Sequence, residues 1–302
     1  MSIQHVAILG LGLLGGSVGL AVREHANSIS TTGYDRDADV RGRAAALGLV
    51  DEVCEIPADA VRNADLVILC VPVGAMETAA SELAPHLKPN AIISDVGSSK
   101  ESVTKALTNA LPAHTIIPAH PVAGTEHSGP EAGFASLFTN RWCILTPPLD
   151  VDETAVAALS DFWAKLGAKV EIMDAAHHDL VLAVTSHIPH LIAYTIVGTA
   201  SDLEEVTRSE VIKYSAGGFR DFTRIAASDP VMWRDVFLNN KGAVLEVLGR
   251  FTEDLTALQR AIRSGDGDTL HDLFSRTRAI RREVIDQGQD DERPDFGRKD
   301  HS

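Results

Sequence analysis

The segment Ile3–Ser17 places a glycine-rich turn directly after an apolar run at the start of the chain. Its glycines Gly10, Gly12 and Gly15 are spaced as G-x-G-x-x-G, a pattern that joins a strand to a helix around a dinucleotide. The first glycine permits the tight turn, the second lets backbone approach a pyrophosphate, and the third allows close helix packing. The following helix offers unpaired N–H groups to phosphates. We therefore expect a nucleotide site here, with a purely structural turn as the alternative.

An acidic residue twenty positions beyond Gly15 strengthens this interpretation. Asp35 stands in TTGYDRD, where a second strand is expected to end and a carboxylate can bind an adenosine ribose. The carboxylate repels a 2′-phosphate and favours NAD, although the adjacent Arg36 could partly rescue NADP binding. The candidate cofactor-binding residues are Gly10, Gly12, Leu13, Leu14, Gly15, Asp35, Arg36, Val71 and Pro72.

Strand-like and helix-like segments alternate through residue 173. Strands are expected at 4–9, 31–35, 66–71, 91–95, 115–118, 141–146 and 169–173. Helices are expected between them, for example at 15–26, 37–47, 74–86 and 152–166. This alternation predicts an α/β Rossmann-type domain, doubly wound, with a mainly parallel sheet that binds ligands at the carboxyl ends of its strands. Polar turns follow three of these ends, at 71–73, 95–100 and 119–121.

After residue 174 the pattern becomes helical, with no clear strand. Helices are expected at 175–201, 203–214, 230–263 and 267–287. Several of these helices have an apolar face but no sheet to pack against, and a partner subunit would bury those faces. We therefore predict an all-α dimerisation domain that forms a homodimer. The charged, turn-rich end of the chain predicts a disordered tail. The expected domains are 1–173, which binds the dinucleotide, 174–288, which binds substrate and forms the dimer, and the tail 289–302.

Composition limits the partners. A chain of 302 residues is comfortable for two domains, and its net charge of −15 argues against nucleic acid and against an anionic membrane surface. No apolar run approaches the ~18 residues of a membrane span. Three scattered cysteines and the lack of a basic leader indicate a reducing, cytoplasmic location. If the substrate is an anion, the acidic chain must supply a local positive centre.

His120 is the first candidate for chemistry. It precedes Pro121 at an expected strand end facing the cofactor crevice, and a residue before proline is restricted to extended conformations. A neutral imidazole held there could accept a hydroxyl proton as hydride leaves the same carbon. The alternative is a histidine satisfied by local backbone. By contrast, we expect His127, His177 and His178 to be surface or capping residues.

A second pair of histidines lies in SHIPHLIAY. His187 and His190 have the i, i+3 spacing of side chains on one side of a helix, so a metal must be considered. Spacing suggests no third ligand, and we expect no metal. The favoured interpretation is that one histidine contacts the substrate and the other is structural. Pro189 between them predicts a bend.

The segment 217–224 supplies the positive centre. The adjacent glycines Gly217 and Gly218 let backbone approach a ligand closely. Arg224 offers the planar fork that binds a carboxylate through two parallel hydrogen bonds. Its alternative role is a surface ion pair with Asp221, which stabilises little.

Together these motifs resemble the prephenate and arogenate dehydrogenases. The resemblance extends from Ile3 to about Ile285 and rests on GLGLLGGS, DVGSSK at 95–100, HPVAGTEHSG at 120–129, SHIPH at 186–190 and GGFRDFTRIAASDPVMWRD at 217–235. It implies a two-domain dimer that carries out the NAD(P)-dependent step making the tyrosine precursor, by oxidative decarboxylation of prephenate or arogenate.

The resemblance also implies roles for single residues. His120 resembles the catalytic histidine that hydrogen-bonds the ring hydroxyl, and Ser98 resembles the serine that positions both beside the nicotinamide. Arg224 resembles the arginine that grips a substrate carboxylate, and His190 a further substrate contact, with His187 not excluded.

Two weaker assignments complete the substrate-binding set. Glu126 looks like a gating acid at the pocket mouth, and Trp233 like a residue reaching the neighbouring subunit's site. The sequence leaves open the choice between prephenate and arogenate, the strictness of NAD over NADP, and inhibition by tyrosine.

Two other functions remain open. One is a helical-domain dehydrogenase for a β-hydroxyacid or imine, for which Lys213 and Lys241 are the available lysines but lack a supporting motif. The other is a non-catalytic NAD-binding module.

Overall fold

The computed structural model describes residues 2–125, 127–202, 213 and 217–284. The chain divides into two compact units, residues 1–244 and 245–302. The larger unit contains both sheets and the helices as far as the start of α12. The smaller unit contains the rest of α12 and α13.

The larger unit is built on a parallel sheet in the order β3-β2-β1-β4-β5-β6. Its strands are β1 His5–Leu9, β2 Ser30–Tyr34, β3 Glu52–Val53, β4 Leu66–Leu69, β5 Ile92–Asp95 and β6 Thr115–Ile116. The order reverses between β1 and β4, which makes their carboxyl ends the switch point where such sheets bind ligands. This confirms the predicted doubly wound Rossmann-type domain.

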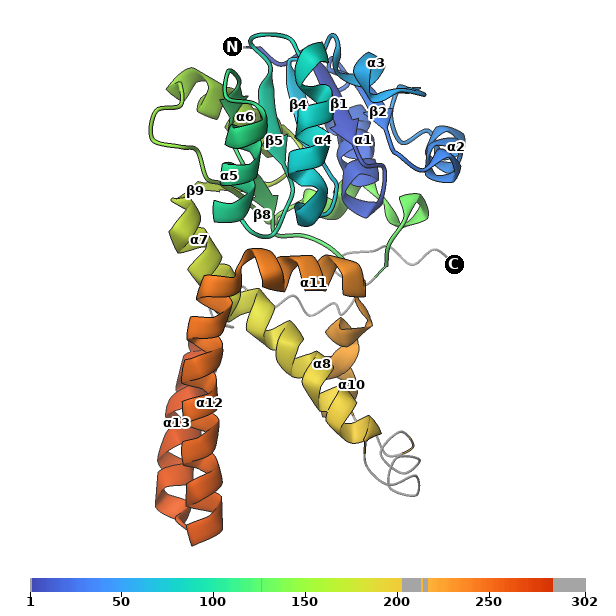
Figure 1. Cartoon of the computed structure of the whole chain (residues 1–302). Helices are drawn as coiled ribbons and strands as arrows, with labels where there is room; N and C mark the ends of the chain where they lie inside the picture. Colours follow the sequence, from blue (N-terminus) through green and yellow to red (C-terminus); the bar gives the residue numbers. More distant parts are fainter. Residues whose placement is uncertain (1, 126, 203–212, 214–216, 285–302) are drawn as a thin grey trace. The chain divides into compact units, whose positions relative to one another are not determined.

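Successive side chains of each strand point to opposite faces of the sheet, and helices cover both faces to form two buried cores. Val6 and Ile8 of β1 belong to the core that includes Trp163, while Ala7 and Leu9 belong to the core that includes Met76. Figure 1 shows α4 and α5 over one face of the sheet. The helices are α1 Leu13–His25, α2 Ala38–Leu47, α3 Pro57–Val61, α4 Met76–Leu83, α5 Glu101–Ala110 and α6 Glu153–Lys165, with the 3₁₀ turns η1 Val73–Ala75, η2 Ala84–His86, η3 Pro130–Ala132 and η4 Ala135–Phe138.

A second sheet departs from the prediction of one continuous sheet. Its order is β7-β8-β9, with β7 Ala119–Pro121 antiparallel to β8 Trp142–Leu145 and β8 parallel to β9 Lys169–Ile172. The chain leaves the first sheet at Pro118, which has no N–H to continue the ladder. His120 consequently lies inside β7, opposite Ile144, rather than beyond a strand end.

The helical region follows β9. Its elements are α7 Ala175–Leu182, the π turn η5 Ala183–His187, α8 Ile188–Ser201, α10 Gly217–Thr223, the 3₁₀ turn η6 Arg224–Ala227, α11 Pro230–Asn239, α12 Lys241–Ser264 and α13 Gly267–Val284. The helix expected at 230–263 is broken at Asn240, whose side chain is buried and donates to the carbonyl of Asp179 at 2.8 Å. The helix expected at 203–214 lies almost wholly outside the described residues, as does the expected tail.

The stretch Ala175–Ser201 bears on the expectation about membranes. It is helical over 27 residues and contains an 18-residue window of mean hydropathy 1.6, enough to span a membrane by length and composition. Polar residues interrupt its apolar ones, so it contains no unbroken apolar run of that length. Within the stretch, Asp179 accepts the backbone N–H groups of Lys100 and Glu101. Such contacts are those of a helix packed on a protein domain.

Candidate active site

The glycine turn has the geometry that its sequence predicts. Gly10 has φ +98°, and a side chain there would collide with the Cys70 carbonyl. A side chain on Gly15 would collide with the Gly10 carbonyl. Gly12, in contrast, has no atom within 4 Å of where a Cβ would stand, and it precedes α1 without a side-chain cap. The N-terminus of α1, formed by Leu13 and Leu14, therefore fits a pyrophosphate.

Asp35 lies beside this turn. Its Oδ2 accepts the Leu11 N–H at 2.9 Å and its Oδ1 accepts the Asp37 N–H at 3.0 Å. These bonds fix the carboxylate at the carboxyl end of β2, the position at which it can bind an adenosine ribose. Arg36 is exposed next to it. After β4, the side chain of Val71 packs beside the glycine turn, with its Cγ1 3.3 Å from where a Cβ of Gly10 would stand. The exposed Pro72 follows it.

A buried ion pair holds the backbone next to His120. The Lys100 ammonium lies 2.5 Å from Asp95 Oδ2 and 2.7 Å from the Ala119 carbonyl, while Asp95 Oδ1 accepts the Ala119 N–H at 3.1 Å. Both charged side chains are fully buried. Burial lowers the pKa of Lys100 and raises that of Asp95, and their mutual attraction opposes both shifts. The pair thus ties the loop that carries Ser98 to strand β7.

Replacing Lys100 with methionine should strongly destabilise the fold. The change leaves a buried carboxylate without its cation, which costs about 3–5 kcal/mol in the free energy of unfolding. Urea unfolding measures it. The matched control is Arg62→Met, which breaks an exposed pair with Asp59 and should cost less than about 1 kcal/mol. Equal losses in the two variants would contradict the structural role of the buried pair.

His120 takes part in a chain of buried hydrogen bonds. Its Nδ1 lies 2.8 Å from His178 Nε2, and His178 Nδ1 lies 2.9 Å from Asp179 Oδ1. Among the described residues, no hydrogen bond reaches Nε2 of His120. Burial lowers the pKa of His120 well below its usual value, and His178, Lys100 and His187 lower it further. The ring is therefore neutral at physiological pH.

The two histidines of SHIPH have different surroundings. His187 is fully buried, its Nδ1 lies 3.1 Å from Asn240 Nδ2, and burial lowers its pKa to about 4. His190 is half-buried, donates from Nδ1 to the Ser186 carbonyl at 2.9 Å, and stacks on Trp233 with ring centroids 3.7 Å apart. The π turn before Pro189 lets both rings face Trp233. His187 is thus the fully buried histidine of the pair and His190 the more open one.

Arg224 lies close to His190. Burial lowers the pKa of His190, and the positive charge of Arg224 lowers it further. On the same segment, the exposed Arg220 forms an ion pair with the exposed Asp221. Gly217 begins α10. A Cβ atom placed on this glycine would lie 3.6 Å from Asp221 Oδ2, which is an ordinary van der Waals contact. Glu126 lies outside the described residues.

Electrostatic interactions connect these groups within the larger unit. His120 is influenced electrostatically by His187, His187 by His190, and His190 by Arg224. Trp233 is buried on α11, which packs against η1 after β4. The His120 imidazole and the Arg224 guanidinium are therefore connected by a series of groups that act electrostatically on one another.

Four residues of the site were not recognised in the sequence. His178 is fully buried on His120, so the expectation that it is a surface or capping residue is wrong; the exposed His177 and His127 fit that description. Asp179, Lys100 and Asp95 are the others. Asp95 and Lys100 lie in the DVGSSK motif, but neither that motif nor the polar character of Asp179 specifies a partner.

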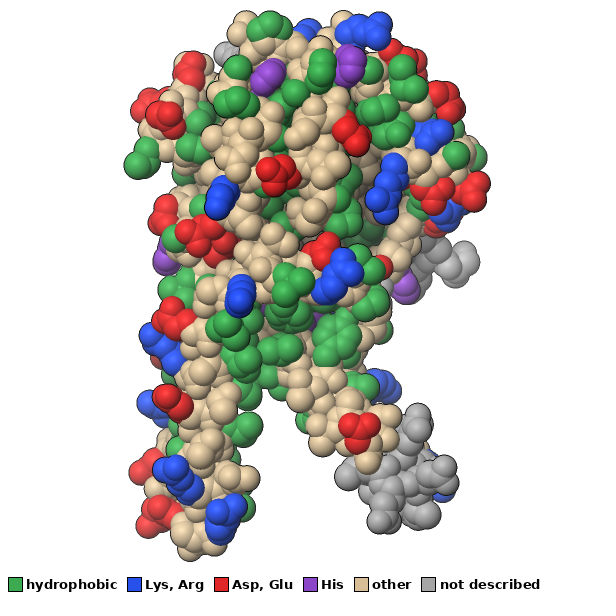
Figure 2. All heavy atoms as spheres, in the orientation of Figure 1, with side chains coloured by type: hydrophobic (Ala, Val, Ile, Leu, Met, Phe, Trp, Pro, Cys, Tyr) green, Lys and Arg blue, Asp and Glu red, His purple; other side chains and the backbone are tan. Residues whose placement is uncertain are grey.

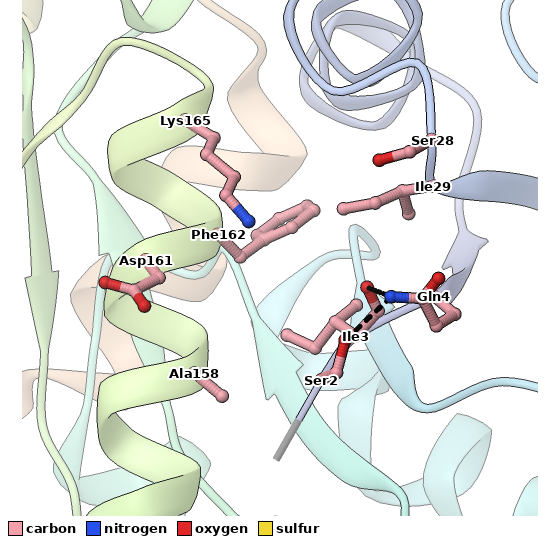
Figure 3. A pocket seen from close by; sticks show the side chains of 9 residues that line it. All are labelled: Ser2, Ile3, Gln4, Ser28, Ile29, Ala158, Asp161, Phe162 and Lys165. Atoms are coloured by element: carbon pink, nitrogen blue, oxygen red, sulfur yellow. Dashed lines mark hydrogen bonds between the residues drawn. The ribbon is translucent and has the colours of Figure 1, made fainter.

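The small hollow in Figure 3 is not part of this site. It has a volume of about 150 Å³ and lies between α6, which supplies Phe162 and Lys165, and the residues that precede β1 and β2. Those residues are at the amino ends of the strands, the edge of the sheet opposite Gly10 and Asp35. Nucleotides bind such sheets at the carboxyl ends.

Comparison with known proteins identifies relatives along the chain. The family model of the prephenate dehydrogenase nucleotide-binding domain matches residues 18–172, and that of the prephenate dehydrogenase dimerization domain matches residues 174–276. A cyclohexadienyl dehydrogenase of Zymomonas mobilis is 48% identical over 92% of this chain and 95% of its own length.

Solved structures of family members are also similar to this chain. Prephenate dehydrogenase from Aquifex aeolicus, in complex with hydroxyphenyl propionate and NAD⁺, has 33% identity and a TM-score of 0.87 over 94% of this chain and 99% of its own. Synechocystis arogenate dehydrogenase has 26% identity and a TM-score of 0.78 over 93% and 99%. A 3-hydroxyisobutyrate dehydrogenase of Mycobacterium tuberculosis, at 16% identity, shares the fold alone.

Proposed function

Because this chain belongs to the prephenate dehydrogenase family, NAD-dependent oxidoreductases of tyrosine biosynthesis, we propose that it oxidatively decarboxylates both prephenate and arogenate with His120 as general base. The two substrates share the cyclohexadiene ring, hydroxyl and ring carboxylate, and differ only in the side chain. The similarity to a cyclohexadienyl dehydrogenase supports activity on the shared ring. The observation that carries the proposal is the buried, neutral His120, whose Nδ1 faces His178 and whose Nε2 receives no hydrogen bond from the described residues.

In this mechanism the chain holds the substrate and moves one proton. Bound NAD⁺ supplies the hydride acceptor. His120 Nε2 accepts the hydroxyl proton as the carbon–oxygen bond becomes a carbonyl. The ring carboxylate leaves as CO₂, its bonding electrons make the ring aromatic, and the resulting phenolate oxygen takes the proton back from His120. Arg224 grips the side-chain carboxylate, His190 gives a further contact, and Ser98 orients the hydroxyl; these roles position the reacting atoms.

An absorbance assay at the reduced-nicotinamide band tests this function. Purified protein should reduce NAD with prephenate and with arogenate in turn, and release CO₂ in equal amount. No reduction with either substrate would overturn the proposal. A β-hydroxyacid dehydrogenase would need a lysine base, but Lys213 and Lys241 are both exposed. A non-catalytic NAD-binding module predicts NAD binding with no turnover.

Asp35 should make NAD the better cofactor. A 2′-phosphate next to this carboxylate would be repelled, so initial rates should favour NAD over NADP. Replacing Asp35 with serine should reduce the NAD-to-NADP ratio of kcat/KM by about tenfold or more, since a charge-assisted hydrogen bond is lost. Asp39→Asn, at an exposed position on α2, is the control. An unchanged ratio in Asp35→Ser would contradict this role.

We further propose that the protein is a cytoplasmic homodimer. Its three cysteines are free thiols, as suits a reducing compartment. Exposed apolar side chains gather over α8 and α11, as Figure 2 shows, and they include Ile196, Val197, Met232 and Leu238. In the smaller unit, Leu255, Ile262 and Phe274 line an apolar groove. The dimerization domain of the relatives supports a second copy as the cover.

Sedimentation equilibrium should therefore give twice the chain mass of 32.3 kDa. Ile262→Asp should weaken the dimer, because it places a charge on a side chain that is 67% exposed in the single chain. A monomer at micromolar concentration in the unmodified protein would contradict the dimer.

A further inference from the structure

His178 and Asp179 are buried in contact with His120, although the proposed reaction does not require them to touch the substrate. His178 is fully buried and Asp179 is 1% exposed. The His120 and His178 rings meet edge to face, with centroids 5.1 Å apart and planes 67° apart. Burying two imidazoles and a carboxylate is costly unless they are hydrogen-bonded, and here all three are.

The direction of these hydrogen bonds follows from Asp179. Its Oδ1 accepts the Lys100 N–H at 2.7 Å and its Oδ2 accepts the Glu101 N–H at 3.0 Å, so the carboxylate acts as an acceptor at the start of α5. His178 Nδ1, 2.9 Å from Oδ1, must therefore donate. A neutral imidazole with its proton on Nδ1 has a lone pair on Nε2.

That lone pair determines the tautomer of His120. Because His178 Nε2 is an acceptor, the His120 Nδ1 at 2.8 Å must carry the proton. The lone pair of His120 is then on Nε2, the nitrogen that has no partner among the described residues. With the opposite tautomer, Nε2 would carry the proton and could not accept one from a substrate.

We propose that His178 and Asp179 are positioning residues that keep the proton of His120 on Nδ1 and so leave Nε2 as the base. This inference rests on the proposed function, because the base matters only if His120 accepts the hydroxyl proton. As that proton arrives, the Nδ1–H bond to His178 strengthens, and the positive charge is shared toward the Asp179 carboxylate.

The other groups around the two rings favour a single proton on each. Lys100, which precedes α5, disfavours a positive charge on both rings, and His187 from the π turn disfavours it on His120. The negative charge of Asp95 on β5 favours a positive charge on His178, but Asp95 accepts a hydrogen bond from the Lys100 ammonium. Asp179 is the carboxylate in direct contact with the chain of imidazoles.

Nitrogen NMR of the histidine rings tests the tautomer directly. Protein labelled with ¹⁵N-histidine and saturated with NAD is measured at neutral pH, and the His120 signals are assigned by their loss in His120→Gln. The proposal predicts an unprotonated Nε2 and a protonated Nδ1. A proton on Nε2 would overturn it. This result does not depend on turnover, so it separates failure of this inference from failure of the proposed function.

Kinetics of variants provide the second test. His178→Leu removes the acceptor and should lower kcat by about 10²-fold, with KM and NAD affinity within about twofold of the unmodified protein. His178→Gln retains an acceptor oxygen and should restore most of kcat. His177→Gln, at the exposed neighbouring position on α7, is the matched control and should keep full activity. Unchanged kcat in His178→Leu would overturn the proposal; if that variant does not fold, the NMR result decides.

Discussion

Replacing His120 with asparagine is expected to lower kcat by about 10²- to 10⁴-fold, the range that positioned proton transfer usually contributes. Asparagine is uncharged and smaller than the imidazole, so it fits the buried site in β7, but it cannot take a proton from the hydroxyl. NAD binding should remain, because the glycine turn and Asp35 lie at the ends of other strands.

Two measurements separate these effects. NADH absorbance gives kcat, and quenching of tryptophan fluorescence gives the affinity for NAD. His86→Asn, at an exposed position in η2, should behave as the unmodified protein. If His120→Asn kept near-normal turnover, the histidine would not be the base.

Replacing Arg224 with alanine is expected to raise KM by about ten- to a hundredfold or more, with a smaller change in kcat. A charge-assisted hydrogen bond contributes about 1.5–3 kcal/mol. The guanidinium can form two such hydrogen bonds with the same carboxylate. Arg224→Lys should have an intermediate KM, since an ammonium retains the charge without the fork.

The control for this experiment is on the same segment. Arg220 is 77% exposed and pairs with an Asp221 that is also exposed, so Arg220→Ala should leave KM within about twofold. Steady-state titration with prephenate and arogenate measures both variants. An unchanged KM in Arg224→Ala would rule out the carboxylate grip.

The features that could be predicted from sequence are those fixed by neighbouring residues. The glycine turn needs only the short segment around Gly10 and Gly15, and the structure confirms its geometry. The parallel sheet follows from alternating apolar segments. Asp35 could be located because its distance from the turn is set by one helix and one strand.

The features that were missed depend on contacts between distant segments. Lys100 reads as a polar turn residue, yet it is fully buried because Asp95 and the Ala119 carbonyl receive its ammonium. His178 reads as a surface residue because its partner, His120, is far away in sequence. The helix break at Asn240 also depends on a distant contact. The apolar periodicity continues through this position, but the Asn240 amide donates a hydrogen bond to the carbonyl of Asp179.

A crystal structure with NAD and the product 4-hydroxyphenylpyruvate tests the central claim most directly, which is that His120 and Arg224 act on one bound molecule. The account predicts the phenolic hydroxyl within hydrogen-bond distance of His120 Nε2 and the side-chain carboxylate on Arg224, with both groups in the same cleft beside the nicotinamide. Finding the two side chains directed into separate cavities would contradict it.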